Sequence, residues 1–326
     1  MENQQENMNQ DEKKEIGWEK ELVEKLVFAA VTEQRRSRRW GIFFKMLTFA
    51  YLIAILVIAT YPRLKNEMGV GGGSKKHAAV IDVHGVIAEN ESASADVIIE
   101  GLRDAVKDKN TQGIILNINS PGGSPVQAAY VYDEIRRLRK KHPDIPIYSV
   151  VSDICASGGY YIAAASDKIY VNQASIIGSI GVIMNGFGFV DVLQKLGVER
   201  RLLTAGAHKA LLDPFSPVNE EESQHMQSLL DQVHRQFIDA VKTGRGERLS
   251  DSPEMFSGLV WTGTEGVKLG LADDFGSVDS VAKEVIGTET KVNFTPQEHL
   301  LDRLVGKFAA SFGHAIGTMA PSLGLR

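Results

Sequence analysis

Residues 113–123, GIILNINSPGG, join an apolar run to a glycine pair, and residues 147–159, IYSVVSDICASGG, follow the same order. Each apolar run predicts a buried strand, and the glycine pair after it lets the backbone turn sharply with its N–H groups facing a ligand. The second corner contains Ser157, which opens a helix-like stretch and is expected to stand on a strained turn. That setting has the mechanics of a nucleophile elbow, although the sequence is not G-x-S-x-G. The two corners together predict an oxyanion hole that faces a serine.

Short strand patterns alternate with helical patterns around these corners. The predicted strands are 78–84, 113–119, 145–152 and 168–171, and the predicted helices between them are 97–107, 125–141 and 157–165. Strands that alternate with helices are typical of βαβ units and predict an α/β fold with a largely parallel sheet. Ligands of such sheets bind beyond the carboxyl ends of the strands, where both glycine corners fall. Further on, we expect a strand at 200–204 and a long helix capped by Asn219 that runs through Val241.

The N-terminal part of the chain predicts a membrane anchor. A polar segment that ends in four arginines precedes an apolar stretch from Gly41 to Tyr61, which has about the 20 residues that a helix needs to cross a bilayer. A core helix and a cleaved signal peptide are the alternatives, but the polar segment is too long for a typical signal peptide. The basic cluster favours a cytoplasmic N-terminus, with the following domain on the periplasmic or extracellular side.

These patterns divide the chain into five parts. They are a polar tail (1–39), a transmembrane helix (40–61), a glycine-rich linker (62–76), a globular domain (77–290) and a C-terminal amphipathic segment (291–326), in which a helix is expected at 300–316. That helix could pack on the globular domain, pack on a partner or lie on the membrane surface, and the sequence does not distinguish these alternatives.

Composition excludes several classes of function. The 326 residues carry a net charge of −5, which gives no reason to expect a nucleic acid partner. The single cysteine, Cys155, excludes an internal disulfide and a cysteine-ligated metal cluster. The sequence has no Walker loop and no metal-ligand cluster, so we expect no cofactor.

Ser157 is the candidate nucleophile, and its alternative role is that of a helix N-cap. The glycine corners favour the nucleophile, because the Gly123 and Gly158 N–H groups can converge on one oxyanion. Cys155 is the rival nucleophile, against the interpretation of a buried inert thiol. None of the eight histidines lies in a setting that marks it as the base. Lys209 follows the expected strand at 200–204 and precedes apolar residues, so it is either a partly desolvated base or a surface lysine.

At this point the chain resembles the signal peptide peptidase A (protease IV) family of membrane-bound Ser-Lys peptidases. The resemblance covers about residues 78–280. Glycine corners alone are not specific, because the Clp protease subunit and the enoyl-CoA hydratases use similar ones. The resemblance rests on five motifs in this order: NSPGG (119–123), ASGGYYIA (156–163), GSIGV (178–182), the Lys209 segment and LGLAD (269–273). It implies a Clp-protease/crotonase-like fold.

Carried over by position, the resemblance implies Ser157 as nucleophile and Lys209 as general base. Gly123 and Gly158 supply the oxyanion donors, Gly122 shapes the turn, and the Ser179 hydroxyl orients the lysine. One departure is His208, where the family often has an aromatic residue before the lysine. The chain has one body and is similar to the short forms of the family, which build rings in which serine and lysine can meet across a subunit boundary.

The sequence and the resemblance together predict a serine endopeptidase in the bacterial inner membrane. Its expected substrates are signal peptides released in the membrane, or other extended apolar peptides, and its expected partners are membrane lipid and further copies of the chain. Two alternatives stay open at this stage. An acyl-CoA hydratase or isomerase would use the same glycine corners on a thioester carbonyl, and a non-catalytic oligomeric scaffold would not need Ser157 or Lys209.

Overall fold

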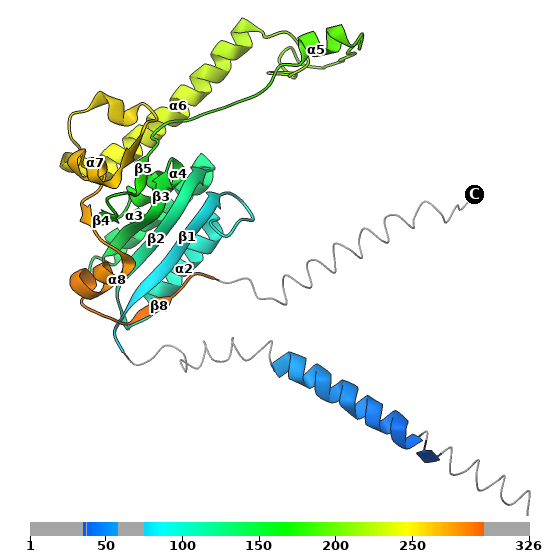
Figure 1. Cartoon of the computed structure of the whole chain (residues 1–326), viewed down its shortest axis with the longest axis vertical. Coiled ribbons are helices and arrows are strands. Elements are labelled where there is room, and N and C mark those ends of the chain that lie inside the picture. The colour runs from blue at the N-terminus through cyan, green and yellow to red at the C-terminus, as the bar shows by residue number, and fades with distance from the viewer. Residues whose placement is uncertain (1–34, 37, 58–74, 297–326) are drawn as a thin grey trace, which may run out of the picture. The chain divides into compact units, whose positions relative to one another are not determined.

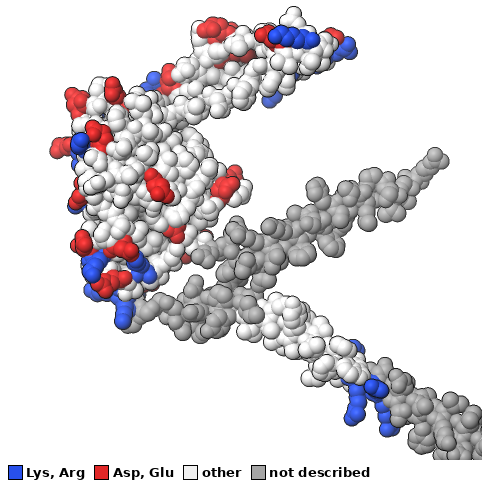
Figure 2. Space-filling model, viewed as in Figure 1, with Lys and Arg blue, Asp and Glu red and all other residues white. Residues whose placement is uncertain are grey.

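A computed structural model describes residues 35–36, 38–57 and 75–296 of the chain. The chain divides into two units, 1–73 and 74–326. In the first unit, Arg38–Val57 forms a helix of 20 residues with a mean hydropathy of 2.0 over its most apolar window. Its length and composition suffice to cross a membrane, and its apolar surface is uncharged except near the N-terminal end (Figure 2). The rest of the predicted anchor and most of the predicted linker lie outside the described residues.

The second unit is built from alternating strands and helices, as predicted (Figure 1). The strands are β1 His77–Ile87, β2 Thr111–Gly123, β3 Ile147–Ala156, β4 Lys168–Val171, β5 Ile176–Gly178, β6 Val260–Thr262, β7 Asp274–Phe275 and β8 Lys291–Asn293. The helices are α2 Ala95–Lys107, α3 Pro125–Lys141, α4 Gly158–Ala163, α5 Val190–Lys195, α6 Glu220–Arg245, α7 Gly263–Lys268 and α8 Val278–Ser280. Short 3₁₀ turns lie at Gly246–Arg248 and Pro253–Phe256, and a π-helical turn lies at Val281–Ile286.

The sheet is mostly parallel. Its strand order is β6-β5-β3-β2-β1-β8, and only β5 and β6 pair antiparallel. Strand β3 has two partners on the same side: its first half pairs with β4, and its last residues pair with β5. Both glycine corners therefore come at the carboxyl ends of the adjacent central strands β2 and β3.

Alternation along the strands sends apolar side chains to both faces of the sheet. Ile81, Ile118 and their neighbours pack against α2, α3 and α4 in the main core, whereas Ile115 and Val150 pack against Val281 on the opposite face. Burial on both faces is the usual requirement of a parallel sheet. Two helices begin where the sequence predicts. Helix α3 begins at Pro125, with Ser124 as its cap, and α6 follows Asn219, whose side chain accepts from the Glu221 and Glu222 N–H groups.

Two segments differ from the expectation. The predicted strand at 200–204 does not form, because no strand lies beside these exposed residues. Residues 291–293, which were expected in a C-terminal segment outside the domain, form β8 and extend the sheet beside β1. The amphipathic helix expected at 300–316 lies outside the described residues.

Candidate active site

Ser157 sits on a strained turn between β3 and α4. Its backbone has φ 50° and ψ −121°, a left-handed conformation that non-glycine residues rarely adopt. Two backbone hydrogen bonds hold it there: the Ser157 N–H donates to the Gly178 carbonyl at 2.9 Å, and the Tyr161 N–H donates to the Ser157 carbonyl at 2.9 Å. Strain of this kind costs free energy and persists where the surrounding structure enforces it, often at functional sites.

The first glycine corner lies directly against this turn. A Cβ atom on Gly122 would stand 2.7 Å from the Ser157 Cβ, and one on Gly158 would stand 3.3 Å from the Gly123 nitrogen. The corner is held by Ser120, whose buried hydroxyl accepts from the Gly122 N–H at 3.1 Å and donates to the Gly85 carbonyl at 2.6 Å. The backbone nitrogens of the two corners are thus close neighbours beside Ser157, the arrangement that an oxyanion hole requires.

A cavity of about 830 Å³ brings four of the predicted site residues together. Ser157, Gly158, Gly123 and Ser179 all line it. Ser179 follows β5 and also has a positive φ of 51°, with its N–H donating to the Leu259 carbonyl at 2.8 Å. The end of β5 therefore makes two contributions to the site: it places Ser179 on the cavity wall, and its Gly178 carbonyl accepts the hydrogen bond from the Ser157 N–H.

Lys209 lies outside this cavity within one chain. It is exposed in a turn between α5 and α6, and the ring of its neighbour His208 approaches Glu222 in the first turn of α6, with 3.1 Å between Nδ1 and Oε1. The α6 residues that line the cavity are Val233, Gln236 and Phe237, 11 to 15 residues further along. At a rise of 1.5 Å per residue, Glu222 and the turn that carries Lys209 beside it are about 20 Å from these residues along the helix axis. Figure 1 shows α5 at the distal end of α6.

Cys155, the rival nucleophile, is fully buried in the main core. Burial raises the pKa of its thiol well above the ordinary value, so the thiol stays protonated. The structure therefore favours Ser157 over Cys155 as the residue that can meet a substrate.

The walls of the cavity come from residues that the sequence analysis did not single out. Two helices supply several of them: Val126, Ala129, Tyr130 and Asp133 of α3, and Val233, Gln236 and Phe237 of α6. The α3 residues follow the spacing i, i+3, i+4, i+7 directly after the first corner, so a helical projection of this segment was the available signal. The α6 residues also share one helix face, at i, i+3 and i+4, but α6 is far from the glycine corners in the sequence, so only the tertiary fold places them here.

The LGLAD segment (269–273) does not line the cavity but contacts the helices that do. Asp273 accepts a hydrogen bond from the buried Arg245 at 2.6 Å and from the Ile169 N–H at 2.7 Å, and the Tyr160 hydroxyl of α4 donates to the Leu271 carbonyl at 2.8 Å. Burial alone would raise the pKa of Asp273, but the hydrogen bond and charge of Arg245, together with the Ile169 N–H and the charge of Arg248, hold the pKa below its usual value. This segment therefore links α4 to the C-terminal end of α6, and both helices contribute residues to the cavity wall.

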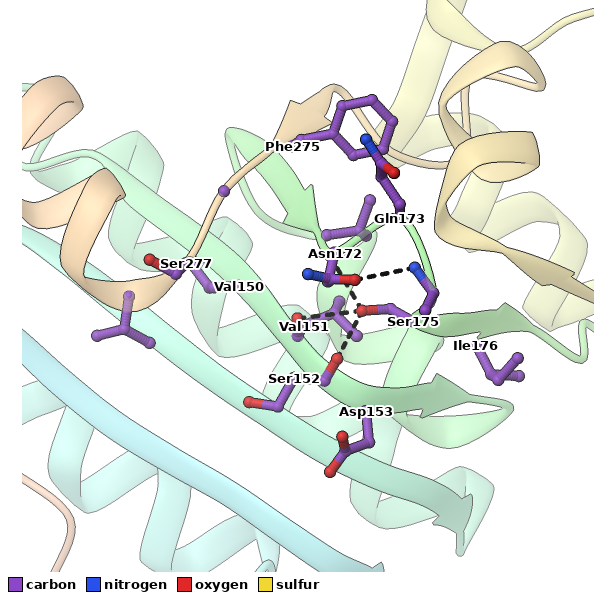
Figure 3. Close-up of a pocket in the computed structure, with 14 residues that line it drawn as sticks. Val150, Val151, Ser152, Asp153, Asn172, Gln173, Ser175, Ile176, Phe275 and Ser277 are labelled. Atoms are coloured by element: carbon purple, nitrogen blue, oxygen red, sulfur yellow. Dashed lines mark hydrogen bonds between the residues drawn. The ribbon is translucent and has the colours of Figure 1, made fainter.

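A second cavity, of about 870 Å³, lies where β3 leaves β4 and joins β5 (Figure 3). Its polar groups bond to one another: the Ser175 hydroxyl donates to the Ser152 carbonyl at 2.5 Å and accepts from the Asn172 N–H at 3.0 Å. None of the predicted site residues lines it. Within the described parts of the chain, no group of three His, Cys, Asp or Glu side chains is arranged to hold a metal ion.

Comparison with known proteins first gives the fold class of the chain and then its family. The family model for Clp protease matches residues 79–177, and the chain thus has a Clp-protease-like α/β fold. The model for peptidase family S49 matches residues 139–292.

Two relatives with peptidase names agree with the family match, and a third relative has a different name. The chain is 33% identical to a putative signal peptide peptidase SppA of Enterococcus faecium, over 68% of this chain and 67% of that protein. It is 29% identical to protease 4 of Haemophilus influenzae, over 63% of this chain and 34% of the relative. It is 44% identical to a protein of Brucella abortus named Na(+)/H(+) antiporter NhaA, over 62% of this chain, but it spans only 27% of that relative's length. The chain therefore belongs to peptidase family S49.

Proposed function

We propose that this chain is a membrane-anchored serine endopeptidase that uses Ser157 as nucleophile and Lys209 as general base. The observation that carries the proposal is the strained turn at Ser157 in contact with the Gly122–Gly123 corner, inside a cavity that opens beside Ser179. Membership of a peptidase family supports the reaction class, hydrolysis of a peptide bond.

In the proposed mechanism, the neutral Lys209 amine takes the proton of the Ser157 hydroxyl as its oxygen attacks a peptide carbonyl carbon. The Gly123 and Gly158 N–H groups hold the oxyanion, an interaction worth about 3–4 kcal/mol per donor. Lys209 then gives its proton to the leaving amine, and in the second half it activates the water that releases the acyl group. Ser179, on the cavity wall, orients the lysine amine.

We further propose that Lys209 reaches the Ser157 of a second copy of the chain. The arm, defined as residues 184–219, carries Lys209 about 20 Å from the cavity of its own chain. The arm has its own contacts, such as the ring stacking of Phe189 on Phe215 and the ion pair of Arg200 with Asp213 at 3.0 Å. Even so, no residue of α5 is buried.

Exposed apolar residues on the arm support contact with another copy. Leu203 is 99% exposed, and Phe187 and Val218 are more than four-fifths exposed. Large exposed apolar residues gathered on one segment are typical of an interaction surface. A closed ring in which each arm reaches the next subunit would cover these side chains and complete each active site.

The apolar walls of the cavity support extended substrates with small or apolar residues, such as signal peptides after their release. The helix Arg38–Val57 supports anchoring in the bacterial inner membrane, and the arginines before it support a cytoplasmic N-terminus with the protease domain on the periplasmic or extracellular side. An anchored active site suits peptides that remain in the membrane.

The test is a complementation experiment with the full chain in detergent. Ser157→Ala and Lys209→Ala should each abolish hydrolysis of a fluorogenic apolar peptide, whereas Lys195→Ala, on the same arm, should not. Equal co-expression of the two inactive variants should restore about one quarter of the parent activity, because a site shared by two chains then has one chance in four of holding both groups.

Two results would contradict the proposal. Activity that survives Ser157→Ala would remove the nucleophile. If both single variants are inactive but co-expression restores nothing, serine and lysine belong to one chain, and the arm must fold back on its own cavity.

A further inference from the structure

The cavity around Ser157 has an uneven charge distribution. Among the described residues that line it, Asp133 is the only one with a carboxylate, and none is Lys, Arg or His. The other walls are apolar, aromatic or neutral polar, including Val126, Tyr130 and Ile183. A single negative charge in such a groove attracts positively charged groups and disfavours negatively charged ones.

Asp133 occupies the far end of the α3 wall. Val126, Ala129, Tyr130 and Asp133 form one stripe of this helix, which begins directly after Gly123. From Val126 to Asp133 the helix rises about 10 Å. An extended peptide advances about 3.3 Å per residue. A substrate whose scissile carbonyl lies at Gly123 and Gly158 therefore places a side chain near Asp133 about three residues away.

The surroundings of Asp133 suit a cation. Tyr161 lies on the same cavity wall with its ring stacked on Phe237 at 4.9 Å between centroids. Burial raises the pKa of Tyr161, and the negative charge of Asp133 adds to that effect, so the carboxylate acts on this aromatic wall. A carboxylate beside apolar and aromatic walls, where water screens its charge less, is a favourable site for an ammonium or guanidinium group.

Two of the neighbouring arginines of α3 are engaged elsewhere, and the third, Arg136, is exposed and does not line the cavity. Arg137 pairs with Glu134 at 2.6 Å, and Arg139 forms its ion pair with Asp167. Neither lines the cavity. Within the described part of the chain, no Lys or Arg nitrogen comes within ion-pair distance of the Asp133 carboxylate, which leaves it exposed to substrate.

We propose that Asp133 is a specificity-determining residue that recognises a lysine or arginine side chain of the substrate, about three residues from the scissile bond. Residues next to that bond meet the apolar part of the groove, at Val126 and Tyr130. The inference rests on the proposed function, because it takes the cavity around Ser157 as the substrate groove. It adds a substrate class, peptides that combine an apolar cleavage site with a nearby basic residue.

The test uses fluorogenic peptides of one apolar sequence in which a single position, scanned on both sides of the scissile bond, is Arg, Leu or Glu. We expect a preference for Arg over Leu of about twofold to fivefold in kcat/KM at one position, the range for a single partly exposed charge pair. The preference should shrink as salt is raised. Asp133→Asn should bring the Arg/Leu ratio of kcat/KM to about one, and Asp133→Lys should favour Glu instead.

Glu100→Gln is the matched control, because Glu100 is an exposed carboxylate of α2 outside the cavity. A preference for Arg that survives Asp133→Asn, or that Glu100→Gln removes equally, would overturn the assignment. Binding of labelled Arg and Leu peptides to the Ser157→Ala chain gives a second readout that needs no turnover. If the parent hydrolyses no peptide and Ser157→Ala still binds the Arg peptide more tightly, the proposed catalytic function fails while the role of Asp133 stands.

Discussion

Gly122 approaches Ser157 so closely that a methyl group on Gly122 would stand 2.7 Å from the Ser157 Cβ. Real Cβ atoms do not come this near, so any side chain at Gly122 must displace the serine turn. The same added atom would meet the Gly158 nitrogen at 2.8 Å, so both the nucleophile and an oxyanion donor would move.

Gly122→Ala should therefore lower kcat by about 100-fold, the effect of moving a reacting group by about 1 Å. Because Gly122 also has φ +104°, the variant should lose about 1–3 kcal/mol of unfolding free energy. Gly287→Ala is the control: its φ is +84° with no atom within 4 Å of the added Cβ. It shares the backbone strain but should keep full activity in a peptide assay. Equal activity of both variants would show that the close contact is unimportant.

Cys155 should behave as an inert core residue. Because it is fully buried with a raised thiol pKa, a thiol reagent should label it only after unfolding in denaturant. Cys155→Ala should retain most of the peptidase activity. Rapid labelling of the native chain with loss of activity would contradict this prediction and support Cys155 as the nucleophile.

Glu134 should make stability depend on pH. Hydrogen bonds from Arg137 and Arg103 lower the pKa of this carboxyl to about 2 and join α3 to α2. A carboxyl whose pKa is lower in the folded state stabilises the fold above its unfolded pKa, and the contribution is lost as pH falls toward the folded pKa. Between pH 5 and pH 3, the parent should lose about 1–2 kcal/mol more unfolding free energy than Glu134→Gln. Urea unfolding at both pH values measures this, and parallel losses in the two proteins would contradict it.

Asp273→Asn should be strongly destabilising. The change leaves the charge of Arg245 buried without its partner, and loss of one member of a buried ion pair costs about 3–5 kcal/mol. Asp274→Asn, at the exposed neighbouring residue, should change the unfolding free energy by less than about 0.5 kcal/mol. Denaturant unfolding of the two variants compares them directly, and equal small effects would show that Arg245 finds another partner.

Local sequence patterns predicted much of the secondary structure of the globular domain. The strands β1 to β4 and the helices α2 and α3 lie where apolar periodicity places them, and α6 begins at its predicted Asn219 cap, because these signals act over a few residues. The expectation failed at 200–204, where the short segment RRLLT has no neighbouring strand to pair with, and at β8, whose three residues are too short to show a pattern.

The glycine corners show what a sequence by itself can establish. A sharp turn after a buried strand needs glycine for reasons local to the backbone, so the residue order alone identifies Gly122, Gly123 and Gly158 as candidate turn and oxyanion residues. Distances between segments are different, because they depend on how helices pack on the sheet. Only the tertiary structure places Ser179 beside Ser157, turns Asp133 of α3 into the groove and holds Lys209 about 20 Å away at the other end of α6.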